Sequence, residues 1–261
     1  MTVQADKASR FRRLHVPGDP LVLCNVWDAG SAAAVERAGA KAIATSSWSV
    51  AAAQGYHDGE HMPFEEMLAI AGRIVRNTDL PVTADFESGY AVDVSRIAEN
   101  AGRLLEVGVI GFNIEDQIID DTGLHGIAEQ CARLGVVRRA AEDFGVPAFL
   151  NARTDVFLNA SPDADPSVLL DETLVRGAAY REAGADGFFV PGLTDPALIQ
   201  AICDALPIPV NIMLGQAQAD LAPFAKLGVA RISLGPAPYI GLMADLERTA
   251  RALSSPAERR P

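Results

Sequence analysis

Four acidic side chains end or follow apolar runs of this chain: Asp58, Asp85, Glu87 and Glu115. The carboxyl ends of parallel strands meet at one edge of a sheet, so carboxylates placed there gather and repel one another. A hard divalent cation with oxygen ligands relieves that repulsion. The pattern therefore predicts a Mg²⁺ site, with Mn²⁺ as the other candidate ion, and favours a metal-assisted enzyme. A single acid would more often cap a helix or face solvent, but four at neighbouring strand ends favour a site.

The spacing of these acids indicates how they share the ion. Asp85 and Glu87 are two residues apart, so they point to the same side of an extended segment. Asp85 directly follows the apolar Pro-Val-Thr-Ala, and we expect it to contact the metal directly. Asp58, Glu87 and Glu115 are expected to bind the ion or to hold its water molecules.

An arginine and two serines also lie at strand ends. Arg153 follows an apolar run in Phe-Leu-Asn-Ala-Arg-Thr-Asp, where its planar guanidinium could hold a substrate carboxylate through two hydrogen bonds. An internal ion pair with Asp155 or Glu115 is the structural alternative, and the two roles are compatible. Ser46 and Ser47 end another run, where hydroxyl and N–H groups could cradle an oxygen-rich ligand.

The composition limits the class of protein. The chain has 261 residues, of which 49% are hydrophobic, and its formal net charge is 22 − 34 = −12. Such a surface discourages nucleic acids and anionic membranes as partners, and no run approaches the roughly 18 apolar residues that span a bilayer. The three cysteines are widely spaced and form no CxxC pair, which favours a reducing compartment over a disulfide framework or a zinc site. We therefore expect a cytoplasmic protein.

Apolar, β-branched runs alternate with helical patterns along the chain. The runs are Leu21–Asn25, Ala42–Ser46, Pro81–Ala84, Val109–Ile114, Pro147–Ala152, Gly187–Val190, Pro207–Ile212 and Val229–Leu234. Helical spacing occupies Val94–Val107, Ala128–Phe144, Asp171–Ala183 and Asp195–Ala205. Glycine follows several helical stretches, as expected of a C-cap before a return strand. Strict alternation implies a parallel sheet, and eight units imply closure into a single (β/α)8 barrel.

The barrel prediction comes with boundaries and an alternative. Residues 1–261 form one domain in this interpretation, with loose ends at 1–9 and 254–261 and a gating loop at 115–127. An open doubly wound sheet is disfavoured, because such folds carry Gly-x-Gly-x-x-Gly after the first strand and this chain has Asn-Val-Trp-Asp-Ala-Gly there. The lysines are too few and too far from the expected mouth for Schiff-base chemistry.

Several motifs, taken in order between residues 14 and 240, resemble those of the isocitrate lyase/phosphoenolpyruvate mutase superfamily. They are Asn-Val-Trp-Asp-Ala-Gly-Ser-Ala from Asn25, Thr-Ser-Ser-Trp from Thr45, Asp58, Asp-Phe-Glu-Ser-Gly-Tyr from Asp85, Ile-Glu-Asp-Gln from Ile114 and Ala-Arg-Thr-Asp from Ala152. The resemblance implies a (β/α)8 barrel that commonly assembles as a tetramer, a dimer of dimers, often with the last helix exchanged between subunits. It also implies Mg²⁺ holding an α-oxocarboxylate or its enolate.

The resemblance assigns a role to each matching residue. The implied metal ligands are Asp85, which contacts the ion directly, and Asp58, Glu87 and Glu115. The implied substrate contacts are Trp27, Ser46, Ser47, Trp48, Asp85, Arg153 and Asn211. Catalytic roles are assigned to Arg153, His125 and Glu115.

The expected gating loop departs most from the superfamily pattern. Lyases carry Lys-Lys/Arg-Cys-Gly-His there, with the cysteine as catalytic acid, whereas this chain has Asp-Asp-Thr-Gly-Leu-His from Asp120. Gly123 stands at the cysteine position and Asp121 at the lysine position. His125 remains as a candidate acid or base, because imidazole titrates near neutral pH, and a solvated loop histidine is the alternative. The Lys-Thr-Asn-Ser version of the mutases is missing as well.

These observations lead to one leading function and two alternatives. We expect a Mg²⁺-dependent enzyme that binds a small α-oxocarboxylate and cleaves or forms the bond beside its carbonyl through a metal-stabilised enolate. A carbon–carbon lyase or an oxaloacetate-type decarboxylase fits this description. The first alternative is a C–P bond hydrolase or mutase acting on phosphonopyruvate. The second is a catalytically weak protein that binds an α-oxo acid such as α-ketoglutarate. Selectivity lies in the loops 115–127 and 158–168, so the sequence leaves the substrate open.

Overall fold

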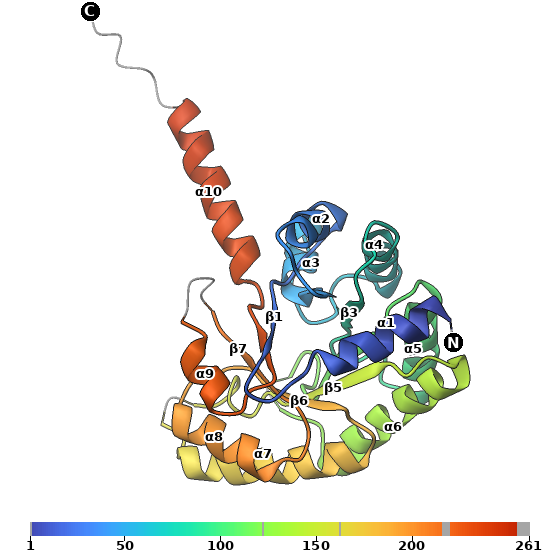
Figure 1. Cartoon of the computed structure of the whole chain (residues 1–261), viewed down its shortest axis with the longest axis vertical. Coiled ribbons are helices and arrows are strands. Elements are labelled where there is room, and N and C mark those ends of the chain that lie inside the picture. Colours follow the sequence, from blue (N-terminus) through green and yellow to red (C-terminus); the bar gives the residue numbers. More distant parts are fainter. Residues whose placement is uncertain (1, 122, 162, 216–219, 255–261) are drawn as a thin grey trace, which may run out of the picture.

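Eight parallel strands form one sheet that curls into a barrel, with helices around its outside (Figure 1). The computed structural model describes residues 2–121, 123–161, 163–215 and 220–254. The strands are β1 (Leu21–Leu23), β2 (Ile43–Ala44), β3 (Val82–Asp85), β4 (Gly111–Glu115), β5 (Phe149–Arg153), β6 (Gly187–Val190), β7 (Val210–Met213) and β8 (Arg231–Ser233). Their order around the sheet is β1-β8-β7-β6-β5-β4-β3-β2, so neighbours in the chain are neighbours in space. The predicted (β/α)8 barrel is confirmed.

Helices precede, connect and follow these strands. They are α1 (Val3–Arg13), α2 (Ala29–Arg37), α3 (Ser47–Gln54), α4 (Phe64–Arg76), α5 (Val94–Glu106), α6 (Ile127–Phe144), α7 (Pro166–Glu182), α8 (Pro196–Ala205), α9 (Ala222–Lys226) and α10 (Ala237–Ser254). Gly108 and Gly184 follow α5 and α7 with φ of 101° and 102°, a conformation that favours glycine and turns the chain back toward the next strand. Within the part of the chain that is described, no helix is both long and apolar enough to cross a bilayer.

The ends of the chain differ from the expectation. Residues 3–9 belong to α1, so the prediction of a loose end at 1–9 is wrong there. The Thr2 side chain accepts a hydrogen bond from Ala5 N at the start of this helix, and Ala5, Ala8 and Phe11 form its buried face. Ser254 ends α10, and the rest of the predicted loose end at 254–261 lies outside the described residues.

The ring closes between β1 and β2 through a short joint. Val26 N donates to Ala44 O at 2.9 Å, and Ser46 N donates to Val26 O at 3.2 Å. Asn25 strengthens the joint, because its Nδ2 donates to Thr45 O at 2.9 Å while its Oδ1 accepts from two backbone N–H groups that follow β8. One amide side chain therefore connects the carboxyl ends of β8, β1 and β2.

Helix α1 packs against the amino-terminal end of the barrel. Phe11 contacts Phe149, the first residue of β5, edge to face, and the ring of His15 stacks on Phe149 at 4.1 Å between centroids. His15 is buried, and its Nδ1 lies 2.9 Å from Phe11 O. Burial, with the charge of Arg231 as a further cause, lowers the pKa of His15 to about 3. The histidine is therefore neutral in the folded protein at neutral pH.

Polar side chains occupy the middle of the barrel beneath its carboxyl end. Asn151 donates to the side-chain oxygens of Asn113 and Asn211 at 3.0 and 3.1 Å, and Arg231 Nη2 donates to Asn113 at 3.2 Å. A Cβ at Gly187 would lie 2.8 Å from the Asn151 oxygen, so glycine leaves the space this network needs. The network fixes Asn113, which lies directly below the candidate site.

Replacing His15 with Phe should reduce the acid sensitivity of the fold. The pKa of His15 is about 3 in the folded protein, against the ordinary value of 6.5 that applies to the unfolded chain. Between these pH values the folded protein binds fewer protons than the unfolded chain, so it loses stability as the pH falls. Between pH 6.5 and 4.5 we expect the free energy of unfolding to fall by about 2 to 3 kcal/mol more in the unsubstituted protein than in His15→Phe. Urea unfolding at the two pH values measures this difference, and parallel losses would contradict it.

Candidate active site

Two connected chambers open at the carboxyl end of the barrel. The inner chamber has a volume of about 230 Å³, and the outer chamber has about 570 Å³. Asp58, Arg153 and Leu158 line both, so the two form one cavity. Asp85 and Arg153 are the last residues of β3 and β5, as a barrel that binds ligands at its strand ends requires.

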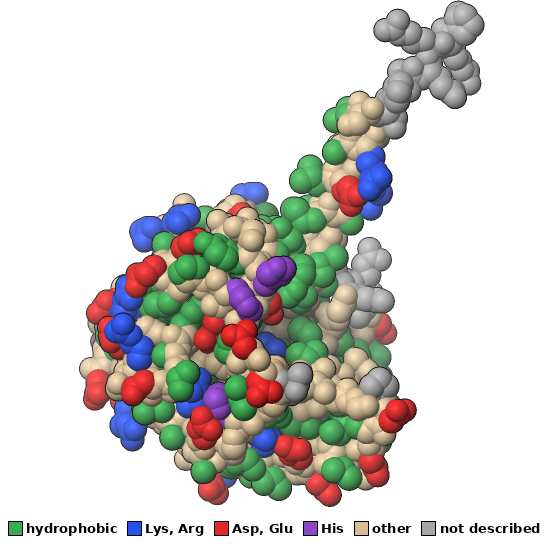
Figure 2. Space-filling view, turned by 180° about the vertical axis from the view of Figure 1, so that it is seen from behind, with side chains coloured by type: hydrophobic (Ala, Val, Ile, Leu, Met, Phe, Trp, Pro, Cys, Tyr) green, Lys and Arg blue, Asp and Glu red, His purple; other side chains and the backbone are tan. Residues whose placement is uncertain are grey.

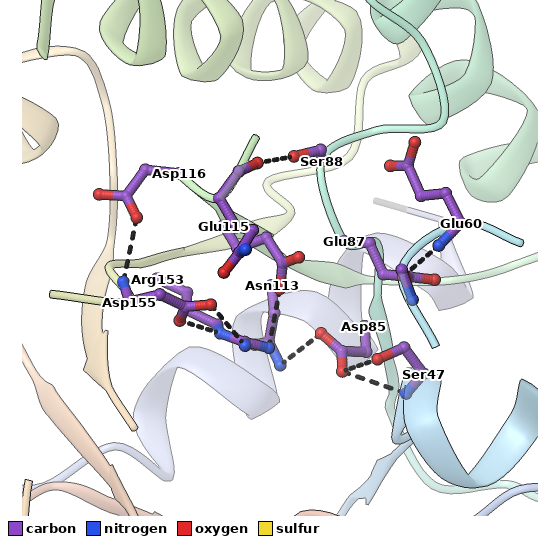
Figure 3. Close-up of polar contacts among 12 residues, drawn as sticks. Ser47, Glu60, Asp85, Glu87, Ser88, Asn113, Glu115, Asp116, Arg153 and Asp155 are labelled. Carbon is purple, nitrogen blue, oxygen red and sulfur yellow. Dashed lines mark hydrogen bonds and ion pairs between the residues drawn. The ribbon is translucent and has the colours of Figure 1, made fainter. Parts of the chain in front are cut away.

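Asp85 lies on the floor of the inner chamber and faces the start of α3. Its Oδ2 accepts from the Ser47 backbone N–H at 3.1 Å and from the Ser47 hydroxyl at 3.0 Å (Figure 3). The first residue of a helix has a free N–H group, and the positive end of the helix favours an anion there. Among the described residues, Oδ1 has only a long contact of 3.5 Å with Asn113 Nδ2. One oxygen is therefore anchored, and the other is available to a ligand.

Glu87 is turned away from the chambers and holds the loop that carries Asp58. Its Oε2 accepts from the backbone N–H groups of Gly59 and Glu60 at 3.0 and 2.7 Å, and its Oε1 accepts from the Tyr90 hydroxyl at 2.5 Å. Its backbone φ of 48° is left-handed, which is costly outside glycine and directs the side chain toward this loop. Burial raises the pKa of Glu87 to about 8, against the opposing effect of the Tyr90 hydrogen bond.

Arg153 lies between two carboxylates. Its Nε and Nη2 donate to the two oxygens of Asp155 at 2.6 and 2.8 Å, and Nη1 lies 2.8 Å from Glu115 Oε2 (Figure 3). Burial alone would disfavour its charge, but Glu115 and Asp155 raise the pKa of Arg153. Burial raises the pKa of Glu115, and Arg153 opposes that rise. Two of the five guanidinium N–H groups donate to Asp155, and Nη1 forms an ion pair with Glu115, so N–H groups on the terminal nitrogens are left for a ligand among the described contacts.

The acids of the mouth form a set suited to a hard cation. Burial raises the pKa of Asp58, and the charge of Asp85 adds to the rise. Asp58 and Asp85 share the inner chamber, and Glu115 lines the outer one. Among the described residues no three His, Cys, Asp or Glu side chains are grouped closely enough to hold a metal ion. The predicted set Asp58, Asp85, Glu87 and Glu115 therefore stays a prediction. An all-oxygen donor set fits Mg²⁺, and burial raises the pKa values of Asp58, Glu87 and Glu115, whose charged forms a nearby cation would stabilise.

Asp116, a buried acid that was not predicted as a site residue, supports Arg153 indirectly by holding the backbone of Asp155. Asp116 is fully buried and accepts from the Asp155 backbone N–H at 3.0 Å and the Thr154 hydroxyl at 2.7 Å. The Tyr180 hydroxyl donates to it at 2.7 Å and Arg176 Nη1 at 3.1 Å. These contacts hold the backbone of the residue that grips Arg153. The acid follows Glu115 directly in the sequence, which was the available signal, but its partners are 38 to 64 residues away.

The structure separates the other predicted substrate contacts into two groups. Ser46, Ser47 and Trp48 line the inner chamber together with Asp85 and Arg153. Trp27 and Asn211 are buried and are not among the described residues that line either chamber. Trp27 packs edge to face on Tyr239 at the foot of α10, with 5.1 Å between ring centroids. Asn211 belongs to the polar network within the barrel.

His125 faces a different cavity. It lines a separate space of about 300 Å³ with Glu60, Tyr90 and Arg133, on the other side of the loop between β4 and α6. Its backbone N–H donates to Asp116 O at 2.7 Å, and its Nδ1 lies 2.9 Å from Glu129. Burial and the charge of Arg133 lower the pKa of His125. Its predicted catalytic role stays a prediction, because this geometry directs the ring away from the chambers.

The loop between β4 and α6 is held in a narrow turn. Ile118 N donates to Gly123 O at 3.0 Å, and Ser88 Oγ donates to Gln117 O at 2.6 Å. Asp120 and Asp121 lie on the wall of the outer chamber, where they add negative charge. The predicted gating loop at 115–127 thus borders the site, and its motion stays a prediction.

A family model for phosphoenolpyruvate phosphomutase matches residues 11–254. The chain belongs to this family. The resemblance to the isocitrate lyase/phosphoenolpyruvate mutase superfamily drawn from the motifs is thereby confirmed.

Solved structures and curated relatives agree with this assignment. A crystal structure of a Burkholderia cenocepacia J2315 protein whose proposed activity is phosphonomutase is 48% identical, with a TM-score of 0.92, and the match covers 95% of this chain and 99% of that one. A second protein from the same organism, a proposed lyase or mutase, is 33% identical, with a TM-score of 0.88 and coverage of 98% and 91%. The oxaloacetate decarboxylase of Pseudomonas aeruginosa (strain UCBPP-PA14) is 32% identical over 178 residues, which are 67% of this chain and 59% of that enzyme.

Removing the buried partner of Arg176 should cost far more stability than removing its exposed partner. Arg176 pairs with Asp116, whose side chain is 0% exposed, and with Glu172, which is 45% exposed. Asp116→Ala takes the buried acceptor away from Arg176, from the Tyr180 hydroxyl and from the Asp155 N–H group, and we expect it to lower the free energy of unfolding by about 3 to 5 kcal/mol. Glu172→Ala should lower it by less than about 1 kcal/mol. Urea denaturation of the two variants compares them, and equal losses would disprove a supporting role for Asp116.

Proposed function

We propose that this protein is a Mg²⁺-dependent enzyme that binds a small α-oxocarboxylate and cleaves or forms the carbon–carbon bond beside its carbonyl. The observation that carries the proposal is the pairing of a half-engaged arginine with carboxylates across one cavity. Arg153 and Asp85 line the same inner chamber and come from the ends of β5 and β3. Membership in a family whose relatives include a decarboxylase supports the same class of reaction.

The side chains of this chain would bind and orient the acid. The N–H groups of Arg153 that do not donate to Asp155 would hold the substrate carboxylate, and Asp155 and Glu115 would keep the guanidinium charged and directed into the cavity. Ser46 and Ser47 bring hydroxyl groups to the same chamber. The apolar residues that line the chamber, among them Trp48, Leu158 and Phe189, would exclude water from the bond that reacts.

The acids would hold the ion on the floor of the chamber. Asp85 would offer the oxygen that does not accept from Ser47, and Asp58 and Glu115 would bind the ion directly or through water. When bound, the ion draws electrons from the carbonyl oxygen and stabilises the enolate charge that develops. Glu87 would act by fixing the loop at Gly59 and Glu60, which places Asp58.

Pyruvate release from an oxo acid substrate should depend on a divalent ion and on Asp85. Asp85→Ala removes the acid on the chamber floor, and we expect turnover to fall by at least roughly 100-fold. Asp79→Ala removes an exposed acid near the opposite end of the same strand, so its activity should match that of the unsubstituted protein. A coupled pyruvate assay with Mg²⁺ and with EDTA measures both variants. Equal rates with and without EDTA would disprove the metal mechanism.

A second candidate is a C–P bond reaction on phosphonopyruvate, because the relative with 48% identity has phosphonomutase as its proposed activity. Its chemistry would use the same enolate charge and differ in the group that leaves. Phosphate or phosphoenolpyruvate formed from phosphonopyruvate under the same conditions would favour this candidate over the lyase.

We also propose that the protein is a homo-oligomer in which α10 contacts a neighbouring copy. The helix projects from the barrel, and apolar side chains run along one side of it (Figures 1 and 2). Ile240, Leu242, Met243 and Leu246 are 38 to 61% exposed. With Leu253 they recur at spacings of three, four and seven residues, which places most of them on one helical face. An apolar stripe of this kind is typical of a contact surface.

Charge on this stripe should weaken the assembly. Leu246→Lys places a cation in the middle of the apolar face, and we expect a smaller mass in solution, because a buried unpaired charge opposes association. Ala252→Lys adds the same charge near the opposite face and should leave the mass unchanged. Light scattering coupled to size-exclusion chromatography measures the mass. An identical mass for both variants would disprove the α10 contact.

A further inference from the structure

The lining of the inner chamber is partly polar and partly apolar. Its charged groups are Asp58, Asp85 and Arg153, and the neutral polar side chains are those of Asn25, Ser46, Ser47, Asn113 and Ser233. Its apolar part, the apolar side, consists of Trp48, Leu158, Phe189, Met213 and Pro236. Phe189 is buried, and its ring centroid lies 5.9 Å from the central carbon of the Arg153 guanidinium. A substrate whose carboxylate binds Arg153 therefore has hydrocarbon to pack against, and the polar groups beside it are neutral or acidic.

The described lining of the cavity offers one cationic side chain to a carboxylate and no second one to an anion at the far end of a substrate. Among the described residues that line the two chambers, Arg153 is the one arginine, and no lysine is present. Residues 216–219 lie outside the described structure, and their sequence, Gln-Ala-Gln-Ala, is uncharged. His61 is the one histidine on the described wall, and its Nε2 lies 3.6 Å from Asp120. Arg231 is fully buried below Asn113 and does not line either chamber.

The outer chamber would repel an anionic group at the far end of a substrate more strongly than the inner chamber would. Its described wall carries five carboxylates: Asp58, Glu115, Asp120, Asp121 and Asp155. A bound dication would balance two charges, and Arg153 balances one more. A second carboxylate or a phosphonate would lose water beside Leu158 and Met213 and would face like charges beyond them. An alkyl group would instead gain from leaving water.

Building on the proposed function, we propose that the substrate is a monocarboxylic 2-oxo acid whose distal substituent is uncharged and apolar. A monocarboxylic acid of this kind has no second carboxylate to lose, so the substrate class selects retro-aldol cleavage of a 4-hydroxy-2-oxo acid over oxaloacetate-type decarboxylation. The C3–C4 bond breaks, and its electron pair remains with C3. The C4 hydroxyl becomes the carbonyl of a departing neutral aldehyde, and its proton, taken up by a wall carboxylate, ends on C3. The products are a pyruvate-type acid and an apolar aldehyde, so no oxidant or other reactant is needed.

Binding of matched oxo acids tests this substrate class. The full chain with Mg²⁺ is titrated by calorimetry with pyruvate, 4-methyl-2-oxopentanoate and 2-oxoglutarate, of which the last two are similar in size. We expect 4-methyl-2-oxopentanoate to bind at least tenfold more tightly than 2-oxoglutarate. Equal or tighter binding of 2-oxoglutarate overturns the inference and leaves the proposed function in place. If none of the three acids binds, the proposed function fails as well.

A variant with a cation on the apolar side tests whether the substrate tail packs there. Leu158→Lys puts a cation on the apolar side at a half-exposed position, and we expect the affinity ratio to move at least fivefold toward 2-oxoglutarate. Val168→Lys adds the same charge on the exposed surface of α7 and should leave the ratio unchanged. An unchanged ratio in Leu158→Lys overturns the inference. Pyruvate release from a 4-hydroxy-2-oxo acid with an alkyl tail should likewise exceed release from oxaloacetate, and the reverse order overturns the retro-aldol assignment.

Discussion

A guanidinium held between two carboxylates determines how the mouth of this barrel is arranged. Glu115 and Asp155 are buried, and the Arg153 side chain is 16% exposed, so each charge is stabilised by opposite charge within hydrogen-bonding distance. The arrangement fixes which edge of the guanidinium faces the cavity. It also keeps two acids away from Asp85, which leaves that carboxylate beside the start of α3. Under the proposed function, this arrangement would set the orientation of the bound acid and the place of the ion.

The support for this arrangement comes from polar side chains that bond to backbone groups. Strand ends of a barrel expose N–H and C=O groups that no neighbouring strand satisfies, and a buried group of this kind needs a partner. Asp116 satisfies such a group after β5, Glu87 satisfies two in the loop after α3, and Asn25 satisfies groups after β8 and β2. Each of these contacts fixes a backbone segment next to a residue that faces the chambers. Their buried positions make them sensitive to substitutions that change the balance of donors and acceptors.

The sequence was sufficient to predict the barrel because its signals are local. Each of the eight apolar runs overlaps one strand, with β3, β4, β5 and β7 ending one residue beyond the run, and the helical patterns at 94–107 and 195–205 match α5 and α8 closely. Helix α1 was not predicted, although Ala5, Ala8 and Phe11 recur at helical spacing, because two of its three buried residues are small alanines among charged neighbours and give a weak apolar pattern. The site was predictable in part: Asp58, Asp85, Glu115 and Arg153 line one cavity, since they end or precede neighbouring strands.

The orientation of individual side chains was not predictable in the same way. The left-handed backbone at Glu87 directs its carboxylate onto a loop, and nothing in the spacing Asp-Phe-Glu indicates that turn. Asn211 bonds within the barrel to Asn151, 60 residues earlier in the chain. His125 faces another cavity because its backbone bonds to Asp116 and its ring to Glu129. Such contacts depend on long-range partners, whereas sequence patterns report mainly on local geometry.

The joint that closes the ring has a thermodynamic consequence. Within the described structure, β1 and β2 meet through the backbone of Val26 and the amide of Asn25, a shorter connection than the paired registers elsewhere in the sheet. Ser46, which follows that joint directly, also lines the inner chamber. A molecule bound against Ser46 would therefore stabilise the contact between β1 and β2. The free energy of unfolding of the barrel would then increase with the fraction of protein that has ligand bound.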